Sequence, residues 1–276
     1  MDFDKYQGIG NDFIIVDAQS DHDVSPEQAA QLCDRRFGIG ADGVILVLPP
    51  REANHAARMR VLNADGSIPE MCGNGIRCMA LHVARTRPAV GAQHQVVYET
   101  DAGPRTCAVG LTPDALGADV TVGMGPVRIL GDLRLGLTGE PSEWAEVDLL
   151  GVDVGNPHAV SLRRPSAAII DRIGPRLATH EAFPEGANIG FADVKDRSFI
   201  DLVVWERGVG LTLACGTGAC AAVGAACARG LASWGEPVTV KLPGGQLTIW
   251  VTAEGGPARM RGPARHVFSG RVDVGG

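Results

Sequence analysis

The chain has 276 residues, of which 45% are hydrophobic and 21% are charged, and its formal net charge is -7 at pH 7. These values predict a folded protein of one large domain or two ordinary ones, and they exclude collagen-like and disordered classes. The acidic balance, with no run rich in lysine or arginine, argues against a nucleic-acid or anionic membrane surface. We therefore expect a small-molecule partner.

The compartment follows from the N-terminal residues and the cysteines. The opening residues MDFDKYQGIG lack a basic segment followed by an apolar run. No stretch approaches the roughly 18 apolar residues that span a bilayer. The seven cysteines are odd in number and lack the short-range framework of a secreted disulfide scaffold. We expect reduced cysteines and a cytoplasmic protein.

The first half of the chain alternates expected strands with one helix. Apolar, β-branched runs predict strands at 13–18, 43–48, up to Asn63, and at 95–100, 105–111 and 119–124. The segment MCGNGIRC runs from Met71 to Cys78 and begins the helix. A core-facing stripe is formed by Ile76, Met79, Ala80, Val83 and Ala84. Arg77 lies off this stripe, so the helix is expected to be amphipathic.

The second half repeats this arrangement. Strands are predicted at 158–162, 199–206, 237–242 and 246–253. The segment ACGTGAC runs from Ala214 to Cys220, and the helix after Cys215 is apolar on every side, with Gly230 as its expected C-terminal stop. Residues 258–274 have strand character, and we expect this tail to return to the first half.

An internal duplication explains the repeat. An offset of 143 aligns Cys72 with Cys215 and also Asn63 with Glu206. Two weaker matches pair Gly10-Asn11 with Gly155-Asn156 at an offset of 145, and Asp42 with Asn188 at an offset of 146. The order of these matches predicts an α/β (α+β) fold of two pseudo-symmetric domains, each a curved mixed sheet around a central helix. The expected domains are 1–117, completed by a C-terminal strand at 263–276, and 118–262.

Cys72 and Cys215 are the candidate reactive groups. Each stands at a predicted helix N-terminus, where unpaired N–H groups and the helix dipole lower the pKa of a thiol from its free value of about 8.5. A pseudo-two-fold axis would set the two thiols across a cleft, where one removes a proton from a carbon and the other returns one to the opposite face. The adjacent N–H groups offer a cradle for a carboxylate; they belong to Gly73, Asn74, Gly216 and Thr217.

Other polar residues suggest a second charged head on the substrate. Arg207 suits a carboxylate and Glu206 suits an ammonium group. Amides that could bind either group are those of Asn11, Asn63, Asn156 and Asn188. The scattered histidines and the absence of C-x-x-C argue against a zinc site, and no lysine lies in a phosphate-binding loop. We expect no metal and no cofactor. The five remaining cysteines are expected to fill the core.

Six segments, in order over nearly the whole chain, resemble the diaminopimelate epimerase family: GNDFIIVD, LNADGSIPEMCGNGIRC, VGNPHAV, EGANIGF, VWERGVGLTLACGTGACA and LPGG. The resemblance implies two pseudo-symmetric α/β domains, with the C-terminus rejoining the first, and a homodimer. It also implies cofactor-independent interconversion of LL- and meso-2,6-diaminopimelate, in the synthesis of lysine and peptidoglycan precursors.

The resemblance carries roles onto matching residues. It implies that Cys72 and Cys215 are the acid/base pair, one thiolate and one thiol at a time. Gly73, Asn74, Gly216 and Thr217 would bind the reacting carboxylate, and Asn11, Asn63, Asn156, Asn188, Glu206 and Arg207 would bind mainly the unreactive end. His158 matches a family position beside the site. At Gly43 some members carry glutamine, so no direct side-chain contact is expected there.

Three alternatives remain open on the sequence alone. The proline racemase and hydroxyproline epimerase group also uses two cysteines, but its first motif typically has histidine where this chain has Asn74. A cysteine hydrolase would need a base for its nucleophile, and His158 could serve only one of the two thiols. A non-catalytic amino-acid-binding or redox-sensing protein would use the pair to form a disulfide.

Overall fold

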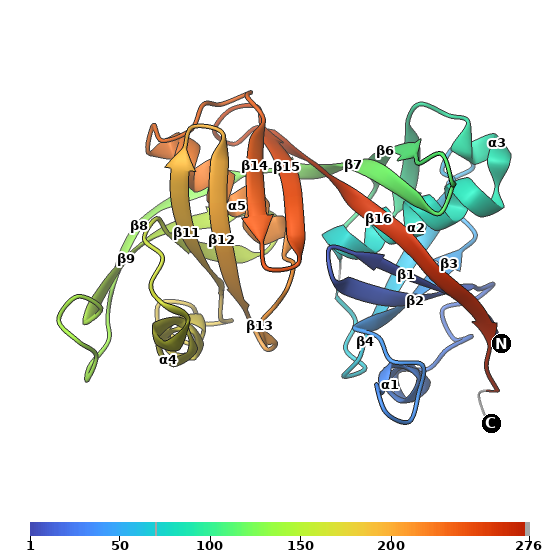
Figure 1. The fold of residues 1–276 in the computed structure, drawn as a ribbon, viewed down its shortest axis with the longest axis horizontal. Helices are drawn as coiled ribbons and strands as arrows, with labels where there is room; N and C mark the ends of the chain where they lie inside the picture. Colours follow the sequence, from blue (N-terminus) through green and yellow to red (C-terminus); the bar gives the residue numbers. More distant parts are fainter. Residues whose placement is uncertain (70, 274–276) are drawn as a thin grey trace. The chain divides into compact units, whose positions relative to one another are not determined.

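The computed structural model describes residues 1–69 and 71–273 (Figure 1). The chain forms two compact units, Met1–Gly123 with Arg261–Gly276, and Met124–Met260. Residues 274–276, at the end of the strand expected at 263–276, lie outside the described residues. Within the described residues, no helix has the length and apolar character needed to cross a membrane.

Among the described residues the strands form one mixed sheet, and the first unit contains part of this sheet together with three helices. Its elements are β1 (Asp2–Gly8), β2 (Asn11–Asp17), α1 (Pro26–Cys33), β3 (Gly43–Leu48), β4 (Ala57–Asn63), α2 (Gly73–Thr86), α3 (Pro88–Gly91), β5 (Val96–Glu99), β6 (Arg105–Leu111), the start of β7 (Gly117–Pro126) and most of β16 (Pro257–Arg271). The pairs β2–β3 and β4–β5 are parallel, while β1–β2, β3–β4, β5–β6 and β6–β7 are antiparallel. The C-terminal strand β16 pairs antiparallel with β1.

The second unit repeats this topology. It contains β8 (Arg128–Gly136), β9 (Glu146–Asp153), β10 (Pro157–Ser161), α4 (Ala167–Ala178), β11 (Asn188–Asp196), β12 (Phe199–Glu206), β13 (Gly210–Leu211), α5 (Gly216–Ala228), β14 (Val238–Leu242) and β15 (Gly245–Val251). Here β10–β11 and β12–β14 are parallel, and β8–β9, β9–β10, β11–β12 and β14–β15 are antiparallel. The same order of pairings in the two units agrees with the predicted pseudo-symmetric α/β fold.

Strand register makes the correspondence residue by residue. Phe13 lies opposite Gly43 in the parallel pair β2–β3, and His158 lies opposite Asn188 in β10–β11. Both members of the second pair follow the first at an offset of 145. Asn188 is therefore the structural equivalent of Gly43, and the predicted match of Asn188 with Asp42 is wrong by one residue. A one-residue error reverses which face of a strand a side chain occupies.

The same register accounts for the change of offset along the chain. Val44 pairs with Leu62 in the first unit, and Ile189 pairs with Trp205 in the second. Equivalent residues are 145 apart on β3 and β11 and 143 apart on β4 and β12. The connection between the two paired strands is therefore two residues shorter in the second unit, and the pairing is unchanged.

In each unit the strands curve around one buried helix. The helix α2 packs against β1, β2, β3, β4 and β6, and α5 packs against β8 to β12, β14 and β15. Figure 1 shows α5 between β11 and β12 in front and β8 and β9 behind. The outer helices α1 and α4 contact the sheets through β3 and β4, and through β11 and β12. The central helices thus hold the two Cys-Gly-x-Gly segments in the interior of their units.

One prediction about α2 is wrong. Its expected apolar stripe is buried, but Arg77, expected away from the core, is fully buried as well. Two of its guanidinium nitrogens have acceptors within the unit, because Nη1 donates to the Gly73 carbonyl at 3.1 Å and Nε donates to the Pro263 carbonyl at 3.2 Å. A buried charge is tolerated where it finds such acceptors.

The second central helix matches its prediction. All residues of α5 from Gly218 to Cys227 are buried. Its small side chains allow close packing, since a Cβ at Gly224 would lie 2.6 Å from Val127 Cγ1. The helix ends where Gly230, at a φ of +70°, donates its N–H to the Cys227 carbonyl at 2.9 Å. This left-handed residue is the predicted glycine stop.

Candidate active site

Cys72 and Cys215 are the N-caps of α2 and α5, with nearly identical geometry. Their backbone angles are φ -129° and ψ 113° at Cys72, and φ -130° and ψ 105° at Cys215. The Sγ atoms accept the N–H groups of Gly75 and Gly218, each at 3.4 Å. A cysteine in place of the usual serine or aspartate N-cap leaves sulfur at the positive end of a helix.

The second glycine of each motif is required by this arrangement. A Cβ at Gly75 would lie 3.0 Å from Ile45 Cδ1 and 3.4 Å from the sulfur of Cys72. At Gly218 a Cβ would lie 3.0 Å from Val204 Cγ2 and 3.1 Å from the sulfur of Cys215. Only glycine lets the amide reach the sulfur while the helix stays packed on its sheet.

In the first unit an amide network surrounds Cys72. The Oδ1 atom of Asn11 lies 4.0 Å from the Cys72 sulfur and accepts a hydrogen bond from Asn74 Nδ2 at 3.1 Å. The Asn11 amide donates in turn to Asp42 Oδ2 at 2.6 Å. Asn11 therefore presents its oxygen to the cysteine because Asp42 fixes which way the amide points.

Asp42 belongs to a wider charged network. Its Oδ2 also accepts the Asp12 N–H at 3.0 Å, and Arg35 bridges Asp42 Oδ1 at 2.7 Å and Asp12 Oδ1 at 2.6 Å. Lys5 pairs with Asp12 at 2.5 Å. Although burial opposes it, pairing with Arg35 and Lys5 leaves the pKa of Asp12 below its ordinary value.

Asn63 and Gly43 lie side by side at the edge of the same strand pair. They are directly opposite in register, and Asn63 Nδ2 donates to Ser67 Oγ at 2.9 Å. A Cβ at Gly43 would lie 2.9 Å from the Leu62 carbonyl oxygen. The strands therefore approach too closely at Gly43 for a larger side chain, unless the backbone moves.

In the second unit a carboxylate lies beside Cys215. Glu206 accepts the Thr212 hydroxyl at 2.5 Å, and its negative charge acts on the ionisation of the Cys215 thiol. Thr217 Oγ1 lies 3.7 Å from the Cys215 sulfur. Burial raises the pKa of Glu206, and the hydrogen bonds from Thr212 and Cys215 lower it in part.

The predicted lowering of the thiol pKa is wrong for Cys215. Burial raises its pKa well above the ordinary value, and the negative charge of Glu206 raises it further. The Gly218 N–H and Thr217 act in the opposite direction but are outweighed. The N–H group at the helix N-terminus lowers the pKa as expected, but the burial that opposes it depends on tertiary packing and has no local pattern in the sequence.

His158 and Asn188 support the neighbouring strand ends. His158 Nε2 lies 3.1 Å from Asn156 Oδ1, and burial lowers the pKa of this histidine to about 3. Asn188 Nδ2 donates to the Pro157 carbonyl at 3.3 Å, while its Oδ1 accepts the Arg207 N–H at 2.9 Å. His158 is therefore neutral at physiological pH, and it orients Asn156.

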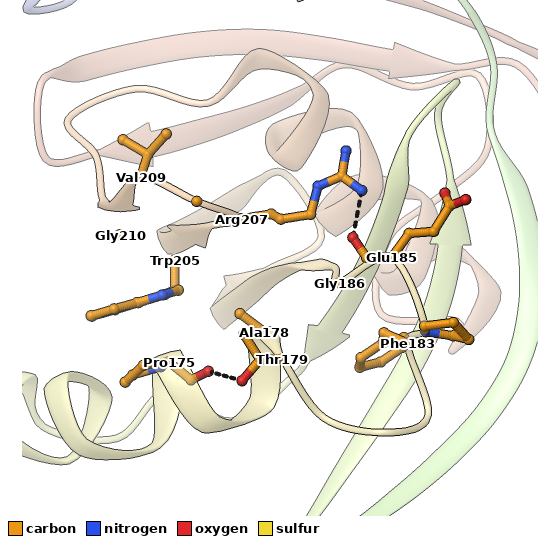
Figure 2. Close-up of a pocket in the computed structure, with 12 residues that line it drawn as sticks. Pro175, Ala178, Thr179, Phe183, Glu185, Gly186, Trp205, Arg207, Val209 and Gly210 are labelled. Carbon is orange, nitrogen blue, oxygen red and sulfur yellow. Dashed lines mark hydrogen bonds between the residues drawn. The ribbon is translucent and has the colours of Figure 1, made fainter. Parts of the chain in front are cut away.

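Arg207 lies at a pocket of about 620 Å³ between α4 and the turn after β12 (Figure 2). Its guanidinium points to the Glu185 carbonyl, to which Nη1 donates at 2.8 Å. Gly186, at a φ of +73°, lies under the Arg207 stem, because a Cβ there would approach Arg207 Cδ to 2.9 Å. The pocket wall is otherwise largely apolar, with Pro175, Phe183 and Trp205.

The predicted site residues are thus divided between the two units. The predicted site residues of the first unit are Cys72, Gly73, Asn74, Asn11 and Asn63. Those of the second unit are Cys215, Gly216, Thr217, Glu206, Asn188, Asn156, His158 and Arg207. Within the described residues, no group of three or more histidine, cysteine or acidic residues could hold a metal ion.

Two residues that hold site side chains were not predicted. Asp42 fixes Asn11, and Thr212 fixes Glu206. Asp42 was noted only in the internal match with Asn188, and nothing in its spacing indicated that its side chain binds Asn11 at the start of β2. Thr212 follows Glu206 by six positions, and only the two-residue strand β13 folds it back.

With this geometry established, comparison with known proteins identifies the family. The diaminopimelate epimerase family model matches residues 3–130 and 151–267. The chain belongs to the diaminopimelate epimerase family. The diaminopimelate epimerase of Gloeothece citriformis is 40% identical over 287 residues, covering 99% of both chains. That of Synechococcus elongatus is 42% identical over 291 residues, again covering 99% of each.

Solved structures support the fold of this family member. A probable proline racemase from Agrobacterium radiobacter has a TM-score of 0.71 at 17% identity, covering 99% of this chain and 93% of that one. Similarity at this level shows a shared fold. Family members named for diaminopimelate epimerisation are isomerases that act on an amino acid, and this chain is an enzyme of that family.

Proposed function

We propose that this enzyme interconverts LL- and meso-2,6-diaminopimelate by proton transfer at one α-carbon between Cys72 and Cys215, without a cofactor. The observation that carries the proposal is the match between the two cysteine N-caps, which agree in backbone angles and in the 3.4 Å contact from glycine N–H to sulfur. Two equivalent thiols suit a reaction that must run equally well from either face of a carbon.

The chemistry balances with the two thiols alone. A thiolate takes the α-proton from one face, and a thiol delivers its proton to the other, so the roles are exchanged after one turnover. Negative charge passes meanwhile to the substrate carboxylate, where N–H groups at the two helix N-termini stabilise it. These N–H groups would come from Gly73 and Asn74 in one unit and from Gly216 and Thr217 in the other.

The unreactive end of the substrate explains the remaining polar residues. A second ammonium and carboxylate would be bound by Glu206 and Arg207, with amide contacts from Asn11, Asn63, Asn156 and Asn188. The charge of Glu206 acts on the Cys215 thiol, so an ammonium held by Glu206 would lie near the reacting centre. Proline has no second charged head, so this pair would favour diaminopimelate over proline.

The proposal also covers the domains, the oligomeric state, the compartment and the pathway of the enzyme. The two units would be the two domains of the predicted duplication, each supplying one of the two cysteines. We further propose a cytoplasmic homodimer whose product supplies lysine and peptidoglycan precursors. Support for these points comes from membership of the family and from the acidic composition of the chain.

Hydrogen exchange in heavy water tests the reaction. LL-diaminopimelate should gain deuterium at one α-carbon as the meso isomer forms, and L-proline should remain unchanged. Cys72→Ala and Cys215→Ala should each abolish epimerisation. Cys227→Ala, in the same helix as Cys215, is the matched control and should retain it. Turnover in either site variant would refute the two-thiol mechanism, and racemisation of proline alone would refute the substrate.

A further inference from the structure

Asn11 and Asn156 occupy equivalent positions in the two units. Each lies two residues before a member of the pair Phe13 and His158, which correspond at an offset of 145. Asn11 is the first residue of β2, and Asn156 directly precedes β10. Both side chains are partly exposed. The backbone thus places the same amide at the start of the same strand in each unit, and only its neighbours differ.

Asp42 sets the direction of the Asn11 amide. A carboxylate can only accept hydrogen bonds, so the 2.6 Å contact with Asp42 Oδ2 must come from the amide nitrogen of Asn11. The amide oxygen then faces Asn74, whose Nδ2 donates to it at 3.1 Å. Asp42 is itself held in place, because Arg35 donates to its other oxygen at 2.7 Å. Asn11 therefore presents an acceptor.

His158 sets Asn156 in the opposite direction. The contact of 3.1 Å joins His158 Nε2 to the amide oxygen of Asn156. An amide oxygen can only accept, so Nε2 carries the single ring hydrogen of the neutral histidine. The amide nitrogen of Asn156 is then directed away from the histidine, where it can donate to a ligand. Asn156 therefore presents a donor.

The partner that orients each asparagine has no counterpart in the other unit. Asp42 directly precedes β3, and the residue that directly precedes the equivalent strand β11 is Ala187. His158 corresponds to Phe13. Ala187 and Phe13 are both buried and have no polar side-chain atom. The opposite directions of the two amides therefore come from two substitutions within an otherwise duplicated framework.

We propose that the two asparagines offer opposite groups to the substrate. Asn11 offers its amide oxygen to an ammonium group, and Asn156 offers its amide nitrogen to a carboxylate. Asp42 and His158 are the positioning residues that set these directions. The proposal deepens the proposed function and rests on it, since diaminopimelate carries both groups. A pseudo-symmetric backbone alone would give both ends of the substrate the same neighbours, whereas opposite amides favour one orientation of the substrate.

The surroundings of Asn156 suit a carboxylate. His158 lies opposite Asn188 in the parallel pair β10–β11, and Asn188 Oδ1 accepts the Arg207 N–H at 2.9 Å. Asn188 thus joins the start of β11 to the residue that carries a cation at the end of β12. A hydrogen-bond donor at Asn156 and the positive charge of Arg207 both favour an anionic group.

Exchanging two residues tests Asn11. Asn11→Asp alone sets a second carboxylate against Asp42, and kcat/KM should fall roughly 100-fold, because like charges in contact repel strongly. In the double variant N11D/D42N the amide at position 42 donates to the carboxylate at position 11, which again offers an oxygen, and the net charge is unchanged. At least about a tenfold part of the loss should be recovered. No recovery would overturn the proposal.

One substitution tests Asn156. Asn156→Asp keeps an acceptor for His158 but turns a negative oxygen toward the substrate carboxylate, so the KM for diaminopimelate should rise roughly 100-fold. Asn54→Asp is the matched control, since it makes the same chemical change at an exposed asparagine outside the site and should keep the wild-type KM. A KM in N156D that equals or falls below that of N54D would overturn the proposal.

The directions of the amides can be measured without substrate. Amide hydrogens that are hydrogen-bonded within the protein exchange slowly with solvent. By nuclear magnetic resonance, the side-chain amide hydrogens of Asn11 should exchange at least about tenfold more slowly than those of Asn156. Their signals are assigned by their absence from the spectra of N11D and N156D. Exchange at Asn156 that is as slow as exchange at Asn11 would overturn the proposal.

Folding and function are separated in this design. Thermal unfolding identifies a variant that fails to fold, and the exchange rates in the wild-type protein then decide the question. If these rates differ as expected but diaminopimelate gains no deuterium, the proposed function fails and the amide directions stand. If diaminopimelate is epimerised and N156D keeps its KM, the function stands and the role of Asn156 is refuted.

Discussion

The Thr212 hydroxyl donates to Glu206 Oε1 at 2.5 Å and so holds the carboxylate whose charge raises the pKa of the Cys215 thiol. This hydrogen bond stabilises the charged form and offsets part of the pKa increase that burial causes at Glu206. Thr212→Val should therefore raise that pKa further. The acidic limb of the kcat/KM profile should move to higher pH, with roughly a tenfold loss of activity below the limb.

Thr212→Ser is the matched control for this effect. It keeps the hydroxyl while removing a methyl group, so the limb should return to its wild-type position. A T212V profile that falls uniformly at every pH would show that Thr212 acts through packing and has no effect on the ionisation of Glu206.

Asp42 fixes Asn11 through the 2.6 Å hydrogen bond to its amide nitrogen. Asp42→Ala should let the amide turn, so that its oxygen no longer faces Asn74 and Cys72. Losing a hydrogen bond to a charged group costs about 2 kcal/mol, so kcat/KM should fall roughly 10- to 30-fold. Steady-state kinetics check this, with the exposed Asp148→Ala as control. Unchanged kinetics in D42A would mean that Asn11 is held by other contacts.

The central features of the fold could be predicted because they repeat. The apolar runs of β2, β3, β12 and β14 read as strands, and the two Cys-Gly-x-Gly segments marked the helices α2 and α5. Both halves carried the same signals in the same order. The five other cysteines are buried as expected, and the family assignment is confirmed by the family match.

Other elements carried no comparable signal. The outer strand β8 is mostly exposed and contains Gly131 at a φ of +113°, so its apolar alternation is weak. The outer helix α4 contains Pro175, which disfavours a helix interior. The burial of Arg77 and the raised pKa of Cys215 depend on what packs around them. Contacts between residues distant in sequence determine both, and local periodicity does not report them.

Gly186 and Gly208 provide a comparison of two glycines with nearly the same backbone. Their φ angles are +73° and +74°. A Cβ at Gly186 would lie 2.9 Å from Arg207 Cδ and 3.0 Å from the Ala178 carbonyl, whereas at Gly208 it would meet nothing within 4 Å. Both Gly186→Ala and Gly208→Ala should lose stability by about 1 kcal/mol or more from the left-handed conformation.

Only Gly186→Ala should also displace Arg207. If Arg207 binds the second carboxylate, the KM for diaminopimelate should rise roughly tenfold in G186A, equivalent to about 1.4 kcal/mol of binding. G208A should keep the wild-type KM. Thermal unfolding and steady-state kinetics measure the two effects separately, and equal KM values in both variants would contradict the role of Gly186.

His158 should make stability depend on pH in a range where most carboxylates do not titrate. Burial lowers its pKa from 6.5 to about 3. Above about pH 6.5 the histidine is neutral in both states and has no effect. As the pH falls below 6.5 the unfolded chain binds a proton that the folded protein excludes, so the free energy of unfolding decreases until about pH 3. The loss should be about 2 kcal/mol at pH 5 relative to pH 7.

His158→Gln should flatten this part of the stability curve, because glutamine does not titrate. Urea unfolding between about pH 4.5 and pH 7 measures the slope. The paired aspartates do not titrate in this range in the folded protein, because their partners hold their pKa below the ordinary value. His22→Gln is the matched control. His22 is exposed, so this variant removes a histidine that is not buried, and it should leave the slope unchanged. A wild-type slope retained in H158Q would place the titrating group elsewhere.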